Sequence, residues 1–304
     1  MNKQIIRSAL LSAAVCALGA CSEGVSAQVN AVEQSGTVQT ERSIADGVTY
    51  RLIERSEPVA QHVHILTLDL DKVRLEVTPG DTSKGREFVA RTPSAYVSEF
   101  DLIAGVNGGY FTPFKGGSRG GEDYYPHAGE AVDVSGASIS NEVEASPVEL
   151  DEDERVNAVI CIEGASVGIR DGQVCEAGID YAMAAGPRLL AGGSTRAFDD
   201  FGLRYANDRH PRTAVGLSED GRTAWLVVVD GRQKEFSEGA SLSELTAIFR
   251  DLGAVDAINL DGGGSTAMAV REDGEVKVVN SPIHTHVPGR ERPSANQLGV
   301  RAAD

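Results

Sequence analysis

The segment from Ser241 to Thr266 reads SLSELTAIFRDLGAVDAINLDGGGST and decides most of the predicted fold. Its first half predicts a helix, because Ser241 and Glu244 have the spacing of a capping box and Gly253 is typical of a helix end. The apolar residues expected on one face of this helix are Leu242, Leu245, Ile248, Phe249 and Leu252. Residues 255–260 are then apolar enough to return as a buried strand.

Two more strands are expected before this helix. Residues 213–217 and 223–229 are largely apolar, and Glu219-Asp220-Gly221 between them suits a hairpin turn. A strand, a crossover helix and a second strand usually give parallel strands of one sheet. Asp230 and Asp261 each follow one of these strands, so we expect both at the same sheet edge, where ligands bind in folds of this kind.

The rest of the chain predicts further strands and one more helix. Strands that should form an antiparallel meander are expected at residues 48–54, 62–69 and 73–79. Pro93 can begin a short helix that ends near Phe100, and residues 102–106 read as a buried strand. The predicted fold class is mixed α/β, with a central mixed β-sheet, few helices and a strand-rich N-terminal part.

The end of the opening segment carries the chemistry. Asp261 is followed by three glycines, Gly262, Gly263 and Gly264, and then by Ser265 and Thr266. Successive glycines let backbone NH groups approach an anion without a side chain in the way. A carboxylate beside such a turn indicates chemistry next to a phosphate.

The N-terminus predicts export. A basic start and a largely apolar run from Ala9 to Ala20 form a signal peptide that is too short to span a bilayer. The sequence Leu18-Gly19-Ala20-Cys21 resembles a bacterial lipobox, which implies cleavage before Cys21 and a lipid on its thiol. The alternative is cleavage after Ala27 and release of a soluble, secreted protein.

The predicted organisation is therefore a signal peptide at 1–20, a flexible tether at 21–44 and one domain at 45–304. The predicted location is the periplasm or the outer membrane, with the lipid anchor as the membrane contact. In an oxidising compartment Cys161 and Cys175 are expected to form a disulfide that closes a local hairpin, the alternative being two separate thiols. The net charge of -17 argues against a nucleic-acid partner.

Several motifs, taken in order along the chain, resemble the phosphodiester glycosidase family. They are Asn107-Gly108-Gly109-Tyr110-Phe111, Gly186-Pro187-Arg188-Leu189-Leu190, Pro211-Arg212-Thr213-Ala214-Val215-Gly216, Asp230-Gly231-Arg232, Asn259-Leu260-Asp261-Gly262-Gly263-Gly264-Ser265 and, more weakly, Glu291-Arg292 with Asn296. Together they cover roughly residues 100–300. The resemblance implies a hydrolase that cleaves a sugar from a sugar-1-phosphodiester, here in exopolysaccharide or envelope glycan metabolism.

The resemblance also implies roles for individual residues. Asp261 would attack the anomeric carbon or activate water, and Arg212, or else Arg188, would stabilise the phosphate. Asp230 would support Asp261 as a sugar ligand, an indirect contact or a metal ligand, and Asn107 would bind sugar hydroxyls. The expected phosphate contacts are the NH groups of Gly262, Gly263 and Gly264 and the hydroxyl of Ser265 or Thr266.

Other interpretations stay open for these residues and for the whole protein. The aspartates, Asn107 and Ser265 are also common as caps of turns and helices, and Arg232, Arg290 and His210, His284 and His286 are expected as exposed loop residues, with Arg292 undecided. The cofactor is open, and a divalent cation on Asp230 and Asp261 would make the protein a metal-dependent phosphoesterase. A non-catalytic envelope lipoprotein that binds polysaccharide is the third reading.

Overall fold

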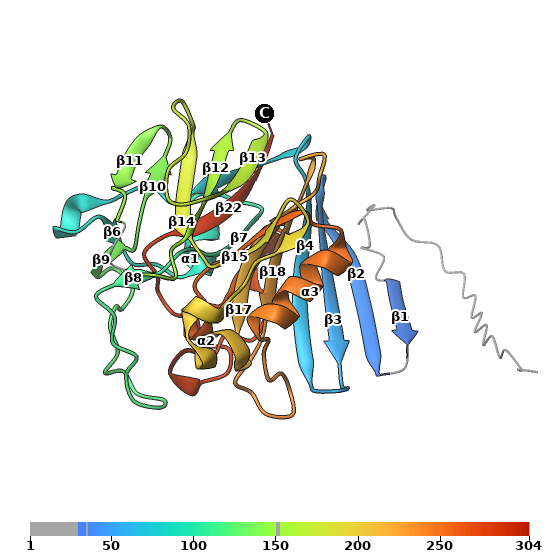
Figure 1. Ribbon diagram of the computed structural model, residues 1–304. Coiled ribbons are helices and arrows are strands. Elements are labelled where there is room, and N and C mark those ends of the chain that lie inside the picture. The colour runs from blue at the N-terminus through green and yellow to red at the C-terminus, as the bar shows by residue number, and fades with distance from the viewer. Residues whose placement is uncertain (1–29, 35, 150–152, 304) are drawn as a thin grey trace, which may run out of the picture.

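The computed structural model describes residues 30–34, 36–149 and 153–303 (Figure 1). The predicted signal peptide and the lipid site at Cys21 lie outside these residues. Within them, no helix has the length and apolar character needed to cross a membrane.

The largest sheet has nine strands and antiparallel pairing throughout. Its strands, in spatial order, are β1 (Asn30–Gln34), β2 (Thr37–Ala45), β3 (Val48–Arg55), β4 (Gln61–Asp69), β18 (Thr223–Val229), β17 (Arg212–Leu217), β19 (Asp256–Asn259), β15 (Arg188–Ala191) and β16 (Ser194–Thr195). The strand-rich fold with few helices confirms the predicted fold class.

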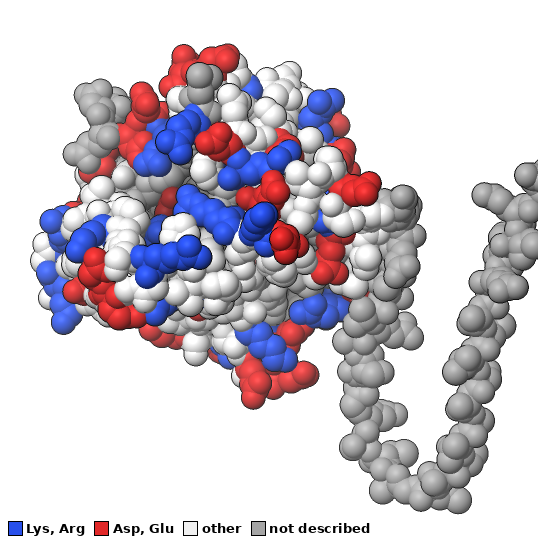
Figure 2. Space-filling model, turned by 90° about the horizontal axis from the view of Figure 1, so that it is seen from below, with Lys and Arg blue, Asp and Glu red and all other residues white. Residues whose placement is uncertain are grey.

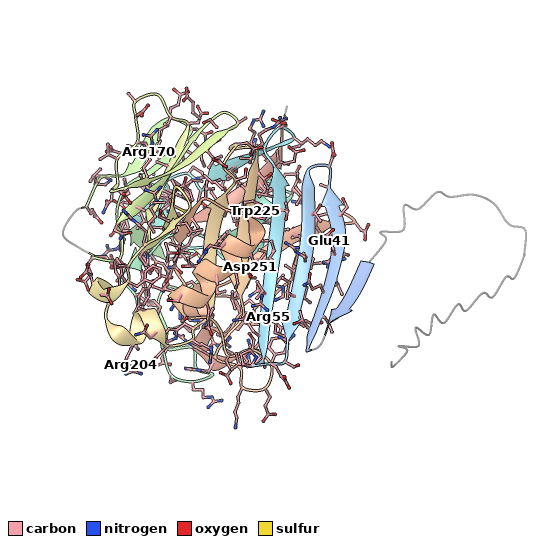
Figure 3. All side chains as sticks on the ribbon, turned by 45° about the vertical axis from the view of Figure 1, so that its right-hand side comes forward. Glu41, Arg55, Arg170, Arg204, Trp225 and Asp251 are labelled. Atoms are coloured by element: carbon pink, nitrogen blue, oxygen red, sulfur yellow. A yellow bond between two sulfur atoms is a disulfide. The ribbon has the colours of Figure 1, made fainter. Side chains whose placement is uncertain are left out.

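The helix α3 (Leu242–Leu252) covers one face of this sheet. The predicted capping box is formed by Ser241 and Glu244, and Gly253 ends the helix in the left-handed conformation that favours glycine. Its buried face packs on Trp225 of β18, and Figure 3 shows Trp225 beside the helix. Burial of these apolar side chains fixes the helix against the sheet.

The strands before and after α3 point in the same direction, as expected, but they are not neighbours. Strand β17 lies between β18 and β19 and runs antiparallel to both. Its first residue, Arg212, pairs with Val229 at the end of β18. The start of β17 and the ends of β18 and β19 therefore meet at one sheet edge, which brings Arg212, Asp230 and Asp261 to that edge.

Two five-stranded sheets cover the other face of the large sheet. One contains β11 (Val143–Ser146), β10 (Ser138–Ser140), β14 (Tyr181–Ala185), β12 (Ala158–Glu163) and β13 (Ser166–Asp171). The other contains β21 (Glu275–Val278), β20 (Met268–Glu272), β7 (Ala104–Asn107), β22 (Gln297–Ala302) and β5 (Val73–Val77). The main hydrophobic core lies between these layers, with side chains such as Leu66, Ile160 and Leu226 fully buried.

The remaining elements are short. A three-stranded sheet is formed by β6 (Phe88–Val89), β9 (Ala131–Val134) and β8 (Phe111–Thr112). The other helices are α1 (Pro93–Glu99), α2 (Leu203–Asn207) and the 3-10 turns η1 (Thr82–Lys84), η2 (Asp199–Phe201), η3 (Gly263–Ser265) and η4 (His284–His286). The predicted helix that begins at Pro93 is thus α1.

Two predictions about the N-terminal part are wrong. Strand β5 does not join β3 and β4 in a meander, because β4 is already paired with β3 on one side and β18 on the other. The chain instead turns at Asp71-Lys72 into another sheet, where β5 pairs with β22. The predicted tether also ends early, since β1 and β2 extend the large sheet from Asn30 to Ala45.

The predicted disulfide is confirmed. Cys161 and Cys175 are bonded, with their Cα atoms 5.8 Å apart. Cys161 lies on β12, which forms a hairpin with β13, and Cys175 follows that hairpin. The bond therefore closes a local hairpin, as predicted.

Candidate active site

A cleft of about 380 Å³ opens at the sheet edge where β17 begins and β18 and β19 end. Its lining includes Tyr110, Arg155, Tyr205, Arg212, Arg232, Asp261, Gly262, Gly263, Gly264 and Arg292. This edge is the lower end of the molecule in Figure 1, where α2 and several loops gather. Figure 2 shows that face, with Lys and Arg atoms clustered near its centre. The cleft is therefore a basic site on a chain of net charge -17.

Asp261 is the carboxylate of this cleft. Within the described residues, no other Asp or Glu contributes to the cleft lining. Burial raises the pKa of Asp261, while the charges of Arg292 and Arg155, a hydrogen bond from Ser265 and the NH of Gly262 oppose the rise. The NH of Gly262 lies 2.9 Å from Asp261 Oδ1. Asp261 is thus a partly desolvated carboxylate held among cations, as expected of a group that acts on substrate.

Two of the three glycines leave room for arginine side chains, and two of the three NH groups are not free to bind an anion. A Cβ atom at Gly264 would lie 2.7 Å from Arg292 Cζ, and one at Gly263 would lie 3.1 Å from Arg232 Nη2. The NH of Gly262 already bonds Asp261, and that of Gly263 donates to Pro211 O at 2.9 Å. The structure therefore differs from the prediction of three free NH donors, because two are used within the protein. The glycines instead let guanidinium groups lie against the backbone.

The role of Arg292 was undecided from the sequence, and in the structure Arg292 lines the cleft. Its Nε donates to His284 Nδ1 at 3.1 Å, and its Nη1 donates to Ser265 Oγ at 3.2 Å. The guanidinium also lies 4.5 Å from the centre of the Phe114 ring. Arg232 is exposed, as expected of a surface charge, and its side chain also lines the cleft, which the sequence did not indicate.

Arg212 is almost fully buried, at 2% exposure, and still lines the cleft. Its Nε donates to Ala240 O at 3.0 Å, and its Nη2 donates to Tyr205 O at 2.6 Å. Both acceptors are neutral carbonyls, and burial lowers the pKa of Arg212. The predicted phosphate-binding arginine thus lies in the site as a cation that two uncharged groups hold in place.

Arg155, Tyr110 and Tyr205 form a second wall that the sequence did not reveal. Arg155 lies 3.9 Å from the centre of the Tyr110 ring and forms an ion pair with Asp153 at 2.5 Å. The two tyrosine hydroxyls are 2.5 Å apart, and Asn259 Nδ2 donates to Tyr205 Oη at 3.1 Å. Tyr110 and Asn259 belong to recognisable motifs, but Arg155 follows an acidic loop without any motif that could have marked it.

The histidines differ from their expected exposed positions. His284 is buried, and burial together with Arg292 and Arg290 lowers its pKa to about 3. It is therefore neutral at physiological pH, and its Nδ1 must be the lone-pair atom that accepts from Arg292. His210 and His286 both line the cleft, and burial, with Arg212 and Arg232, lowers the pKa of His210. Only His286 is exposed as expected.

Asp230 lies at the predicted edge but behind the cleft. Its side chain is 1% exposed and accepts from His64 Nε2 at 3.0 Å and from Asn280 Nδ2 and the NH of Ser281, each at 2.9 Å. His64 in turn contacts the hydroxyl of Tyr50 at 2.7 Å. Asp230 thus anchors the segment that leads to His284 and Arg292, and it does not line the cleft.

Four other predicted residues lie beside the cleft or away from it. Asn107 is buried and donates to Asp261 O at 2.6 Å, so it holds the backbone of the catalytic candidate. Ser265 contacts Arg292, and Thr266 is buried with no partner for its hydroxyl among the described residues. Arg188 forms ion pairs with Asp171 and Asp256, away from the cleft.

The described residues offer no cluster of three or more His, Cys, Asp or Glu side chains that could hold a metal ion. Asp261 faces the cleft, whereas the oxygens of Asp230 are bonded to His64, Asn280 and Ser281. The two aspartates are thus not arranged as a pair of metal ligands.

Comparison with known proteins agrees with the sequence motifs. The profile of the phosphodiester glycosidase family matches residues 100–301. An uncharacterized SPbeta prophage-derived protein of Bacillus subtilis is 39% identical over 75 residues, which are 25% of this chain and 11% of that protein. The chain thus matches only about a tenth of the length of this curated relative.

Solved structures show the same fold. The catalytic domain of zebrafish N-acetylglucosamine-1-phosphodiester alpha-N-acetylglucosaminidase, auto-inhibited by its pro-peptide, has a TM-score of 0.55 and 18% identity, covering 91% of this chain and 82% of that one. A hypothetical protein from Synechocystis has a TM-score of 0.55 and 16% identity, covering 84% and 62%. A putative exported protein from Burkholderia pseudomallei has a TM-score of 0.53 and 16% identity, covering 83% and 77%.

Proposed function

Because the chain belongs to the phosphodiester glycosidase family, we propose that it hydrolyses a sugar-1-phosphodiester in its basic cleft. The observation that carries this proposal is the placement of one partly desolvated carboxylate, Asp261, among Arg155, Arg232 and Arg292. In the proposed reaction the bond between the anomeric carbon and the phosphate oxygen breaks. Water adds a hydroxyl to the sugar, and the aglycone leaves as a phosphomonoester.

The arrangement suits a leaving group that is already anionic. An ordinary glycosidase pairs its nucleophile or base with a carboxylic acid that protonates the leaving oxygen. A departing phosphomonoester is stabilised by guanidinium groups instead, because they bind the charge that develops on its oxygens. Arg292 and Arg232 lie against Gly264 and Gly263 beside Asp261, and Arg212 faces the same cleft.

Asp261 takes the role on the sugar side of the scissile bond. Its carboxylate attacks the anomeric carbon, or removes a proton from the attacking water, while the arginines hold the phosphate. Asn107 donates a hydrogen bond to the backbone oxygen of Asp261, and the NH of Gly262 donates one to its Oδ1. These two bonds fix the position of the carboxylate. Burial keeps the carboxylate more basic than an exposed aspartate and thereby favours both roles.

The proposed setting is the cell envelope. The signal sequence and the lipobox-like Leu18–Cys21 support export and attachment through a lipid on Cys21. A phosphodiester-linked sugar of an exopolysaccharide or envelope glycan is then the proposed substrate. The zebrafish protein with the same fold is named for action on N-acetylglucosamine-1-phosphodiesters, which supplies the first substrate to test.

The deciding experiment is hydrolysis of an N-acetylglucosamine-1-phosphodiester in water labelled with oxygen-18, using the chain from Ser22 onward. Label in the released sugar is expected, because the proposed reaction breaks the bond between carbon and oxygen. Label in the phosphate would instead identify a phosphoesterase. Binding without turnover would favour the polysaccharide-binding reading.

The matched variants are Asp261→Asn and Asp251→Asn. Both remove one negative charge, but Asp251 is exposed on α3 (Figure 3) and lies outside the cleft. Activity should be lost only in Asp261→Asn. Equal activity in both variants would show that Asp261 is not the catalytic carboxylate.

A further inference from the structure

The cations of the cleft outnumber its anions. Arg212, Arg232 and Arg292 line it, and among the described residues none of the three forms an ion pair with an Asp or Glu side chain. Asp261 is the one carboxylate there within the same part of the chain. A phosphodiester group brings one further negative charge, so one arginine charge is still unbalanced after such a substrate binds.

Other groups in the cleft do not remove this excess. Arg155 adds a cation, but its ion pair with Asp153 balances it. His284 is neutral, as its low pKa shows, and supplies no charge of either sign at physiological pH. Arg188, whose side chain is largely buried, is paired with Asp171 and Asp256, whereas Arg212 is buried and has no such partner among the described residues. Leaving the buried Arg212 unpaired is costly, so the excess charge indicates a missing anion.

Arg212 is the cation with the weakest link to Asp261. The charge of Asp261 acts on Arg232 and Arg292 and opposes the lowering of their pKa by burial, whereas no carboxylate in the described part of the chain opposes it at Arg212. Arg212 is also the most buried of the three, and its bonded acceptors are the backbone oxygens of Ala240 and Tyr205. Its charge is therefore available to an anion other than the phosphate beside Asp261.

We propose that the substrate carries a second anionic group, a further phosphate or a carboxylate, which binds Arg212 while Arg232 and Arg292 hold the scissile phosphodiester. This inference rests on the proposed function, since it assigns the scissile phosphate to the arginines beside Asp261. The preferred substrate is then a polyanionic sugar phosphodiester, and a neutral aglycone is recognised poorly. Two phosphates, or one phosphate and one carboxylate, match the charge of the cleft.

The test uses inert analogues of an N-acetylglucosamine-1-phosphodiester in which a methylene group replaces the anomeric oxygen. Three analogues share a two-carbon aglycone and differ only in its terminal group, which is a hydroxyl, a carboxylate or a phosphate. Their dissociation constants are measured by titration calorimetry with the full chain and with Arg212→Gln. Arg170→Gln is the control, because it removes the same charge from β13, at the end of the molecule opposite Arg204 (Figure 3).

We expect a charged terminal group to improve binding by about tenfold at low salt, in keeping with a charge-assisted hydrogen bond. Added salt should reduce this preference only slightly, because Arg212 is almost fully buried and salt screens buried charges weakly. Arg212→Gln should bring the preference close to one, whereas Arg170→Gln should keep it. The larger of the carboxylate and phosphate effects identifies the second group.

Equal binding of the three analogues would overturn the inference, as would an absence of binding or a preference that survives Arg212→Gln. If Arg212→Gln weakens all three analogues by the same factor, Arg212 holds the scissile phosphate and the inference again fails. Because the analogues cannot be hydrolysed, these outcomes do not depend on turnover. A chain that shows the preference and yet fails to release sugar would contradict the proposed function alone.

Discussion

Replacement of Gly264 by alanine tests whether the absence of a side chain at this position is needed to place the Arg292 guanidinium. The new Cβ would lie 2.7 Å from Arg292 Cζ, whereas ordinary contacts begin at 3.4 Å. The guanidinium must therefore retreat by about 0.7 Å at Cζ. Its bonds to His284 and Ser265 are 3.1 and 3.2 Å long, at the upper end of the usual range, so a shift of this size that lengthens either bond would break it.

The magnitude follows from these contacts. A hydrogen bond to a charged group contributes about 1.5–3 kcal/mol, and about 1.4 kcal/mol corresponds to a tenfold change in rate. Loss of one such bond in the transition state, or an equivalent displacement of Arg292, should lower kcat/KM by roughly 10- to 100-fold. Folding should be little affected, because the movable end of a side chain is what the Cβ atom meets.

The assay is hydrolysis of the N-acetylglucosamine-1-phosphodiester, with thermal unfolding measured on the same samples. Gly168→Ala is the control, since Gly168 lies on β13 with open space around the position of a Cβ atom and needs no positive φ. A Gly264→Ala protein that is folded and within twofold of the wild type would refute the reasoning, because Arg292 would then tolerate displacement.

Three other perturbations have defined outcomes. Asp261→Asn should abolish turnover and raise the melting temperature at pH 7. The pKa of Asp261 is raised in the folded state, so the folded wild type loses stability as pH rises from the unfolded pKa through the folded pKa. The gain in melting temperature should therefore disappear in acid, which melting curves at several pH values would show. His284→Gln should flatten the acid destabilisation measured by urea unfolding between pH 6.5 and 4, because a pKa of about 3 means that the unfolded chain binds this proton first; an unchanged pH slope would contradict the buried neutral histidine. The double replacement of Cys161 and Cys175 by serine should lower the free energy of unfolding by about 3 kcal/mol, with kcat/KM retained; equal stability of the reduced and oxidised wild type would argue against this.

Local patterns in the sequence predicted the centre of the fold well. The capping box of Ser241 and Glu244, the glycine at 253 and the hairpin before them depend on neighbouring residues, and all three are present. Pairing between distant strands was harder. Nothing in the alternation of residues 73–79 shows that both edges of β4 are taken by β3 and β18, so the meander prediction failed for β5.

The site was predicted to a similar extent. The motifs predicted one site that contains Asp261, Arg212 and the three glycines, and in the structure all of them line the same cleft. Contacts that depend on packing were out of reach, such as the stacking of Arg155 on Tyr110. The hydrogen bonds that turn Asp230 away from the cleft also come from side chains far along the chain, His64 and Asn280.

The antiparallel strand between β18 and β19 has a practical consequence. Because β17 and β18 form a hairpin whose open end contributes to the cleft, their connecting turn, Ser218–Arg222, lies at the opposite end of both strands. Glu219, Asp220 and Gly221 are exposed there. A fluorophore attached at this turn would label the protein without blocking the cleft. An affinity peptide inserted there would immobilise the protein on a surface with the cleft facing the solution.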